Sequence, residues 1–168
     1  MAKVTLTEFQ ALPDPLTSDL YEFVIDRIPG GGDQRALRIQ CQQVSVPSKT
    51  VEAVTVDLAA NTLMFAGRMT FDHSMNVTFV ENRRMDIYKA LDVWAEYCRN
   101  KETQLGHYKA EYSSSAQLYV YDQKGVMIKN FRIFGLWINV IPEYQFDSSA
   151  STLITCAATF QFDYFESK

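Results

Sequence analysis

The most regular stretch of the sequence is TLITCAATFQFDY, which runs from Thr152 to Tyr164. Apolar and polar side chains alternate along it with a period of two, which is typical of a β-strand with one buried face. The apolar set is Ile154, Cys156, Ala158, Phe160, Phe162 and Tyr164, and the polar set is Thr155, Thr159, Gln161 and Asp163. The sequence therefore predicts a long strand near the C-terminus whose apolar side packs on a core.

Similar β-rich patterns recur upstream and predict strands at 21–26, 36–46, 69–80, 116–121 and 126–138. The strands are separated by turn residues, for example Asp122 to Gly125. Strands in series with short turns indicate an antiparallel sheet that curls into a barrel or sandwich. We expect a mainly β fold of about eight strands with a single helix packed outside the sheet.

The expected helix spans about 84–101, after a capping residue at Asn82. Apolar residues recur there at spacings of four, three and four, which places them on one helix face. This stripe consists of Ile87, Leu91, Trp94 and Cys98.

Residues 51–66 predict a β-hairpin that turns at Ala59 to Asn61. Its strands carry apolar residues on both faces, and no neighbouring segment of the sequence is suited to cover them. We therefore expect a contact arm with the apolar residues Val51, Val54, Val56, Leu58, Leu63 and Phe65.

Length and composition favour one globular domain. Of the 168 residues, 47% are hydrophobic and 13% aromatic, enough for a core and a partner surface. The formal charge is −4, from 16 basic and 20 acidic residues, which argues against a protein that grips a phosphate backbone. We expect an irregular lead-in at 1–19 and a single domain at 20–168. Met1 to Glu8 lacks a signal-peptide pattern, so we expect a soluble protein without a membrane anchor that folds in a cytoplasm.

The sequence offers no constellation typical of catalysis. His73 and His107 are 34 residues apart, outside any zinc-ligand spacing, and no nucleophile elbow or phosphate-binding glycine motif occurs. Cys41, Cys98 and Cys156 are widely spaced, which favours reduced thiols in apolar surroundings, with an intersubunit disulfide as the alternative. We expect no catalytic, cofactor or metal site.

The order of several short motifs resembles the tail tube proteins of contractile-tailed bacteriophages over about 20–166. The motifs are Val44-Ser45-Val46-Pro47, Gly67-Arg68-Met69-Thr70-Phe71-Asp72, a helix containing Trp94, Gly135-Leu136-Trp137, Tyr144-Gln145-Phe146-Asp147 and Phe162-Asp163-Tyr164-Phe165. The resemblance implies a barrel-like subunit that forms six-membered rings, which stack into a hollow tube inside a sheath. It also implies a place in the tail of the virion, after assembly in the host cytoplasm.

By the same resemblance, the hairpin at about 50–65 stacks ring on ring, and the outer helix faces the sheath. The implied partners are other copies of the chain, the tail sheath protein, the baseplate tube initiator, the tape-measure protein and the tail terminator. Double-stranded DNA passes through without specific binding.

A surface along which DNA slides should lack clustered positive charge. The polar sides of two expected strands meet this condition, with a solvated sheet face as the alternative interpretation. The lumen candidates are Arg38, Gln40, Gln42, Asp72, Ser74, Asn76 and Thr78.

Related barrels serve as baseplate tube initiators and as type VI secretion ring proteins. A monomeric β-barrel that binds a small ligand is a rival of another class, and an enzyme is the weakest option.

Overall fold

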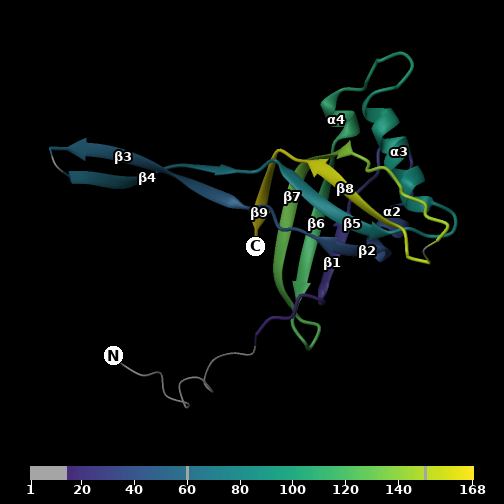
Figure 1. The fold of residues 1–168 in the computed structure, drawn as a ribbon, viewed down its shortest axis with the longest axis horizontal. Helices are drawn as coiled ribbons and strands as arrows, with labels where there is room; N and C mark the ends of the chain where they lie inside the picture. Colours follow the sequence, from purple (N-terminus) through teal and green to yellow (C-terminus); the bar gives the residue numbers. More distant parts are fainter. Residues whose placement is uncertain (1–14, 60, 150) are drawn as a thin grey trace.

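The computed structural model describes residues 15–59, 61–149 and 151–168, and antiparallel strands dominate it (Figure 1). The strands are β1 (Tyr21–Ile25), β2 (Cys41–Val44), β3 (Lys49–Leu58), β4 (Asn61–Phe71), β5 (Ser74–Val80), β6 (Ser114–Tyr121), β7 (Met127–Val140), β8 (Thr155–Gln161) and β9 (Tyr164–Ser167). The helices are α2 (Gln34–Ile39), α3 (Asp86–Cys98) and α4 (Lys109–Tyr112). The expected mainly β antiparallel fold is confirmed. The described residues form nine strands, against about eight expected, and three helices instead of the single helix expected.

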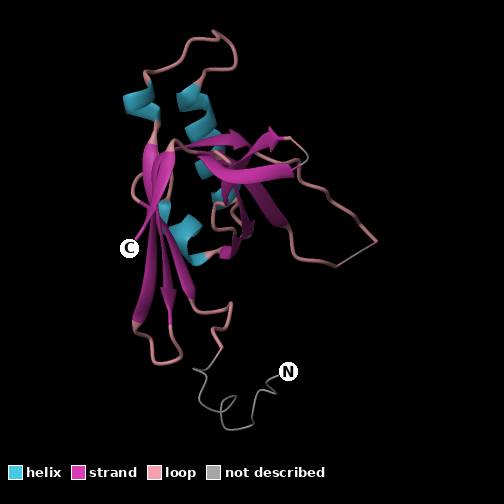
Figure 2. Cartoon of the chain, turned by 90° about the vertical axis from the view of Figure 1, so that its left-hand side faces the viewer, coloured by secondary structure: helices cyan, strands magenta, loops and turns pink. Residues whose placement is uncertain are grey.

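Seven strands form one curled sheet in the order β1-β6-β7-β8-β5-β2, and β9 also pairs with β7. β7 takes part in two layers, because its first half pairs with β6 and β9 and its last residues pair with β8. Figure 2 shows these two groups of strands running in different directions. Strands β3 and β4 pair only with each other in the described residues and project from the body (Figure 1).

Gly135 lies at the corner where β7 passes from one layer to the other. Its φ is +69°, a conformation that costs little for glycine and more for other residues. A Cβ at this position would run into the side chain of Asp163. The Asp163 N–H donates to the Phe134 carbonyl at 2.9 Å, and its carboxylate pairs with Lys109. Glycine thus allows β7 to bend while the chain after β8 crosses close beside it.

Side chains from both layers and from α3 form one apolar core. Phe23, Phe79 and Phe160 are fully buried, and the Trp94 ring packs on Phe160 with 5.8 Å between centroids. The Trp94 indole N–H donates to the Tyr112 carbonyl at 2.8 Å, so its polar atom is satisfied. Full burial of a phenylalanine side chain such as Phe79 contributes about 1.5–3 kcal/mol.

The predicted stripe of α3 is confirmed at three positions, since Ile87, Leu91 and Trp94 are buried. Cys98, the last residue of the helix, is half-buried. Asn82 does organise the start of the helix, because its Oδ1 accepts from the Asp86 N–H at 3.2 Å. The N-cap position itself belongs to Met85, so the helix is shorter than the expected 84–101.

Glu81 satisfies the next free N–H groups of α3. Its Oε1 accepts from the Ile87 N–H at 3.2 Å, and its Oε2 accepts from the Tyr88 N–H at 3.0 Å. The Tyr144 hydroxyl donates to the same carboxylate at 2.7 Å. A carboxylate at a helix N-terminus is favourable for the helix dipole, so these contacts fix α3 against the end of β5.

Three predicted strands were wrong in part. The strand expected at 36–46 is α2 followed by the short β2. The strands expected at 69–80 and 152–164 are each divided, the first at residues 72–73 and the second at residues 162–163. Of the expected lead-in, residues 1–14 lie outside the described residues, and residues 15–20 form no helix or strand.

Candidate assembly surfaces

The arm formed by β3 and β4 carries most of the large apolar residues of its distal part on one face. Val54 pairs with Phe65 and Val56 pairs with Leu63, so these four side chains point to the same side of the hairpin. Leu58, which follows in phase, extends the set towards the tip. All five are exposed, with Phe65 at 54% and Leu58 at 57%. The arm is thus an uncovered apolar surface, as the sequence indicates.

The opposite face of the arm is more polar than the sequence analysis expected. It carries Thr55 and Asp57, and the Thr62 hydroxyl donates to the Asp57 carboxylate at 2.6 Å. Met64, opposite Thr55, is the large apolar residue on this side. The apolar character of the distal arm is therefore concentrated on the Val54 side, which is the face suited to a partner.

A bulge separates the distal arm from its root. The pairing register shifts between Val51 and Ala53, and Gly67 lies at this shift. A Cβ at Gly67 would approach the Val54 side chain to 2.7 Å and the Glu52 carbonyl oxygen to 3.0 Å. Val51, a candidate contact residue, lies on the root side of the bulge and is 51% exposed.

The root of the arm is anchored to the body by aromatic contacts. The Phe71 ring lies 4.7 Å from the His73 ring and 5.8 Å from the Phe165 ring, between centroids. The Lys49 ammonium lies 4.8 Å from the centre of the Phe165 ring. The arm therefore leaves the body from a fixed base, whereas its distal part is free of the core.

The lumen candidates do not lie on one surface. Ser74, Asn76 and Thr78 alternate with the buried Met75, Val77 and Phe79, so they share the outward face of β5. Gln42 is exposed on the neighbouring strand β2, beside a register shift, and Asp72 is exposed in the turn before β5.

Two lumen candidates belong to a helix instead of a strand. Arg38 lies in α2 and forms an ion pair with Glu22 of β1, and Gln40 is the C-cap of α2. The reason is the helix cap at Asp33, whose carboxylate accepts from the Arg35 N–H at 2.9 Å and the Ala36 N–H at 3.4 Å. The interpretation of Arg38 and Gln40 as residues of a polar strand face was wrong.

Sequence reasoning assigned no role to the polar side of β8, which completes the outward face of β5. Thr159 lies opposite Asn76, and its hydroxyl donates to the Asn76 Oδ1 at 2.8 Å. Gln161 lies opposite Ser74 in the same register. The alternation of polar residues in 152–164 was the signal that could have identified both.

The layer formed by β2, β5, β8 and the end of β7 contains no charged residue. Its sequences are CQQV, SMNVTFV, TCAATFQ and, for Trp137–Val140, WINV. The other layer does carry charges, among them Glu22, Arg132 and Glu166. The outward face of the first layer is therefore uncharged; it combines polar side chains with Trp137 and Val140, which lie opposite Gln161 and Thr159.

Both edges of this uncharged layer are open. Within the parts of the chain that the structure describes, β2 pairs only with β5 and Trp137–Val140 pairs only with β8. The four strands alternate in direction, so β2 and β7 run oppositely. Unpaired edge strands are templates for pairing with another chain.

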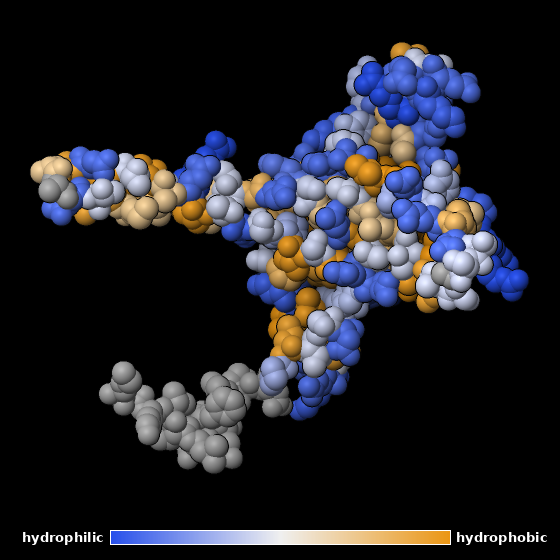
Figure 3. All heavy atoms as spheres, in the orientation of Figure 1, coloured by the Kyte–Doolittle hydropathy of each residue, from blue (hydrophilic) through white to orange (hydrophobic). Residues whose placement is uncertain are grey.

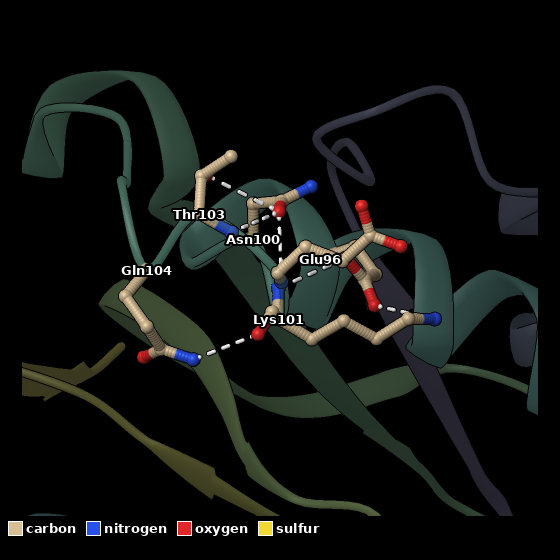
Figure 4. A network of polar contacts seen from close by, with 6 residues as sticks. Glu96, Asn100, Lys101, Thr103 and Gln104 are labelled. Carbon is tan, nitrogen blue, oxygen red and sulfur yellow. Dashed lines mark hydrogen bonds and ion pairs between the residues drawn. The ribbon is translucent and has the colours of Figure 1, made fainter.

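The remaining polar clusters have structural explanations. The loop after α3 is held by its own contacts, since Asn100 Oδ1 accepts from the Thr103 N–H at 3.0 Å and Glu96 pairs with Lys101 (Figure 4). The hydrogen bond from Lys101 lowers the pKa of Glu96. The described residues hold no group of three or more side chains suited to a metal ion, and none of their helices is long and apolar enough to cross a membrane.

The similarity of this chain to known proteins is detected by comparing structures, and not by comparing sequences. No family model and no curated protein matches the chain. A chain of the anti-feeding prophage baseplate matches with a TM-score of 0.66 and 12% identity, over 94% of this chain and 97% of that one. A chain of the PVC sheath–tube complex, an extracellular contractile injection system, matches with a TM-score of 0.61 and 12% identity, over 99% of both chains.

A type six secretion system protein matches with a TM-score of 0.50 and 9% identity, over 86% of this chain and 80% of that one. At these identities the likeness is one of fold. The chain therefore has a fold that also occurs in contractile injection systems and type six secretion.

Proposed function

We propose that this chain is the repeating subunit of the tail tube of a contractile-tailed bacteriophage. Six copies form a ring, the rings stack into a hollow tube inside a contractile sheath, and the tube conducts the genome into the host. The observation that carries the proposal is the uncharged layer with two open edges. The fold of the chain is similar to that of chains from two contractile injection systems, which supports assembly into a tube.

The directions of the strands in the uncharged layer suit ring closure. When Trp137–Val140 of one copy lies beside β2 of the next, the two strands are antiparallel, because β2 and β7 run oppositely within each copy. The antiparallel alternation then continues around a head-to-tail ring without a break. Such a heterologous contact closes into a ring when its rotation permits, and closure pairs both open edges of the uncharged layer.

In such a ring the uncharged face of β5 and β8 lines the channel. Ser74, Asn76 and Thr78 present hydroxyl and amide groups, and no lysine or arginine is available there to hold phosphates. On β2, Gln43 lies opposite Thr78, Gln42 is the neighbouring residue at the register shift, and Asp72 lies in the turn before β5. DNA is then free to slide.

The implied partners follow from this position. A sheath protein lies outside the tube, a baseplate initiator starts it, a tape-measure protein sets its length and a terminator caps it. The neighbouring structures come from a sheath–tube complex, a baseplate and a tube-terminating cap, which supports partners of these kinds.

Electron microscopy of the negatively stained protein, with its mass from light scattering, tests the proposal. Six-fold rings that stack into hollow tubes are expected, either spontaneously or after addition of a baseplate-like seed. Rings that never stack would indicate a baseplate initiator instead of the repeating subunit. A strict monomer at every concentration, with and without the seed, would overturn the proposal and favour a ligand-binding module.

A further inference from the structure

The apolar face of the arm has a matching surface elsewhere on the same chain. We propose that this face docks in an uncharged groove of a second copy, where the ends of β1 and β6 meet β2. The inference rests on the proposed function, since it names the site on the neighbour that receives the arm.

The groove has a volume of about 620 Å³. Thr, Ser, Gln and Tyr side chains complete its lining, and none of the residues that line it is charged. Leu16 and Val46 are 61% and 45% exposed, so apolar surface is open at the groove before assembly. The apolar residues of the lining are Leu16, Leu20, Val44, Val46, Leu118 and Val120.

The distal arm is suited to an uncharged site. Among residues 53–66 the only charged residue is Asp57, which lies on the face opposite Val54 and accepts a hydrogen bond from Thr62. Docking of the Val54 face therefore removes apolar surface from water without burying a charge.

Other grooves of the body are less suited to this face. One is lined by Glu22, Asp26 and Arg38, and another by Asp92 and Glu96. An apolar face pressed into either would remove these charged groups from water, which is costly without new partners. The uncharged groove is the one that matches the arm in chemistry.

The occupant comes from another copy because the arm points away from its own body (Figure 1). Figure 3 shows apolar surface on the arm and a further apolar area on the lower part of the body. Two different complementary surfaces on one chain make a heterologous contact, and a heterologous contact that does not close produces an open stack. Docking of the arm thus explains growth along the tube, separately from closure of the ring.

Cysteine cross-linking between differently tagged copies tests the contact. One copy carries Val56→Cys on the apolar face, and the other carries Val46→Cys in the groove. After assembly and mild oxidation, we expect at least roughly tenfold more mixed-tag dimer than with the control Asp57→Cys, which lies on the other face, since a disulfide needs Cα atoms within about 7 Å. The parent protein gives the background from its own cysteines.

A second pair of variants tests the groove by charge. Leu16→Asp is expected to leave the fold and the rings intact and to prevent their stacking. Leu105→Asp, at a residue 74% exposed in the loop after α3, should stack like the parent. If assembled tubes give cross-links only between two arms, or if Leu16→Asp stacks normally, the docking proposal is wrong and the tube function stands. If the parent itself never assembles, both proposals fail.

Discussion

Burial affects the pKa values of all three cysteine thiols, those of Cys41, Cys98 and Cys156. Burial raises the pKa of the Cys41 thiol to about 11, against lowering contributions from hydrogen bonds with Tyr21 and Gln43. Burial alone raises the pKa of the Cys98 thiol to about 11. Burial raises the pKa of Cys156 as well. Burial is also the main cause of the raised pKa of Tyr144, whose hydroxyl donates to Glu81. Near neutral pH these thiols are protonated and react slowly.

These raised pKa values predict a loss of stability in alkali. In the unfolded chain a thiol releases its proton near pH 9, whereas the folded protein holds the protons of Cys41 and Cys98 until about pH 11. Between these values the unfolded state binds fewer protons, so the free energy of unfolding decreases as pH rises. Urea unfolding of the unassembled protein at pH 7, 9, 10 and 11 measures the slope. Cys98→Ser should flatten the slope between pH 9 and 11, and an unchanged slope would contradict the assignment.

At the scale of single elements, the corner of β7 depends on glycine. Gly135→Ala places a methyl group against Asp163 at a positive φ, so the carboxylate must turn away and lose its pairing with Lys109. We expect a loss of about 2–4 kcal/mol in the free energy of unfolding. Gly125→Ala is the matched control, because Gly125 also has a positive φ but a Cβ there meets nothing within 4 Å. It should lose only about 1–2 kcal/mol, and equal losses in urea unfolding would argue against the crowding at Gly135.

The arm is expected to serve assembly and to contribute little to folding. Val54→Asp with Val56→Asp alters two exposed side chains outside the core, so the free energy of unfolding should change by less than about 0.5 kcal/mol per site. Polymerisation should be lost, because the charges lie on the apolar face.

The control for this pair is Ala53→Asp with Thr55→Asp, which adds the same charge to the opposite face of β3. It should fold and polymerise. Circular dichroism and sedimentation velocity separate the two effects. Unfolding of the Val54 and Val56 variant would mean that these residues belong to the core.

The sequence predicts the long periodic elements well and the short ones poorly. The stripe of α3 and the alternation of β5 and β8 are set by repeated burial, which local spacing reveals. At 36–39 the alternation of Leu37 and Ile39 suits a strand as well as a helix turn, and the Asp33 cap decided for the helix. The breaks at 72–73 and 162–163 are in contact, since the Phe162 N–H donates to the His73 carbonyl across the sheet. Because this contact joins residues far apart in the sequence, no local sequence pattern predicts it.

The candidate assembly surfaces were predictable to different degrees. The exposed apolar arm was predictable because no segment adjacent in the sequence is suited to cover its apolar residues. The uncharged sheet face was only partly predictable, since it combines β2, β5, β8 and the end of β7, which are far apart in sequence. Its lack of charge becomes evident once the strands are placed side by side.

At the scale of the whole molecule, the uncharged layer predicts how the proposed channel responds to added charge. Asn76→Lys with Thr78→Lys changes the outward face of β5, so in the proposed ring every subunit would add two positive charges to the channel. Cations that contact phosphates release counterions and bind DNA more tightly at low salt. We expect tubes of normal appearance and reduced genome delivery, with the defect larger at low salt than at high salt.

Glu102→Lys is the matched control, because it changes the charge by the same amount in the exposed loop after α3. It should deliver DNA normally. Electron microscopy of the tubes and infectivity at two salt concentrations measure the two properties. Normal infectivity of the Asn76 and Thr78 variant would count against this face as the channel wall.

The continuity of β7 has a mechanical consequence. A pull on a neighbour attached at Trp137–Val140 passes along one covalent backbone, around Gly135, into the strands paired with the first half of β7. The pulling force therefore reaches the second layer through the covalent backbone of β7 and through the hydrogen bonds between its paired strands. It does not depend on packing contacts between side chains. In the proposed ring, a force applied to one subunit would therefore pass to its neighbours along covalent backbone and paired strands.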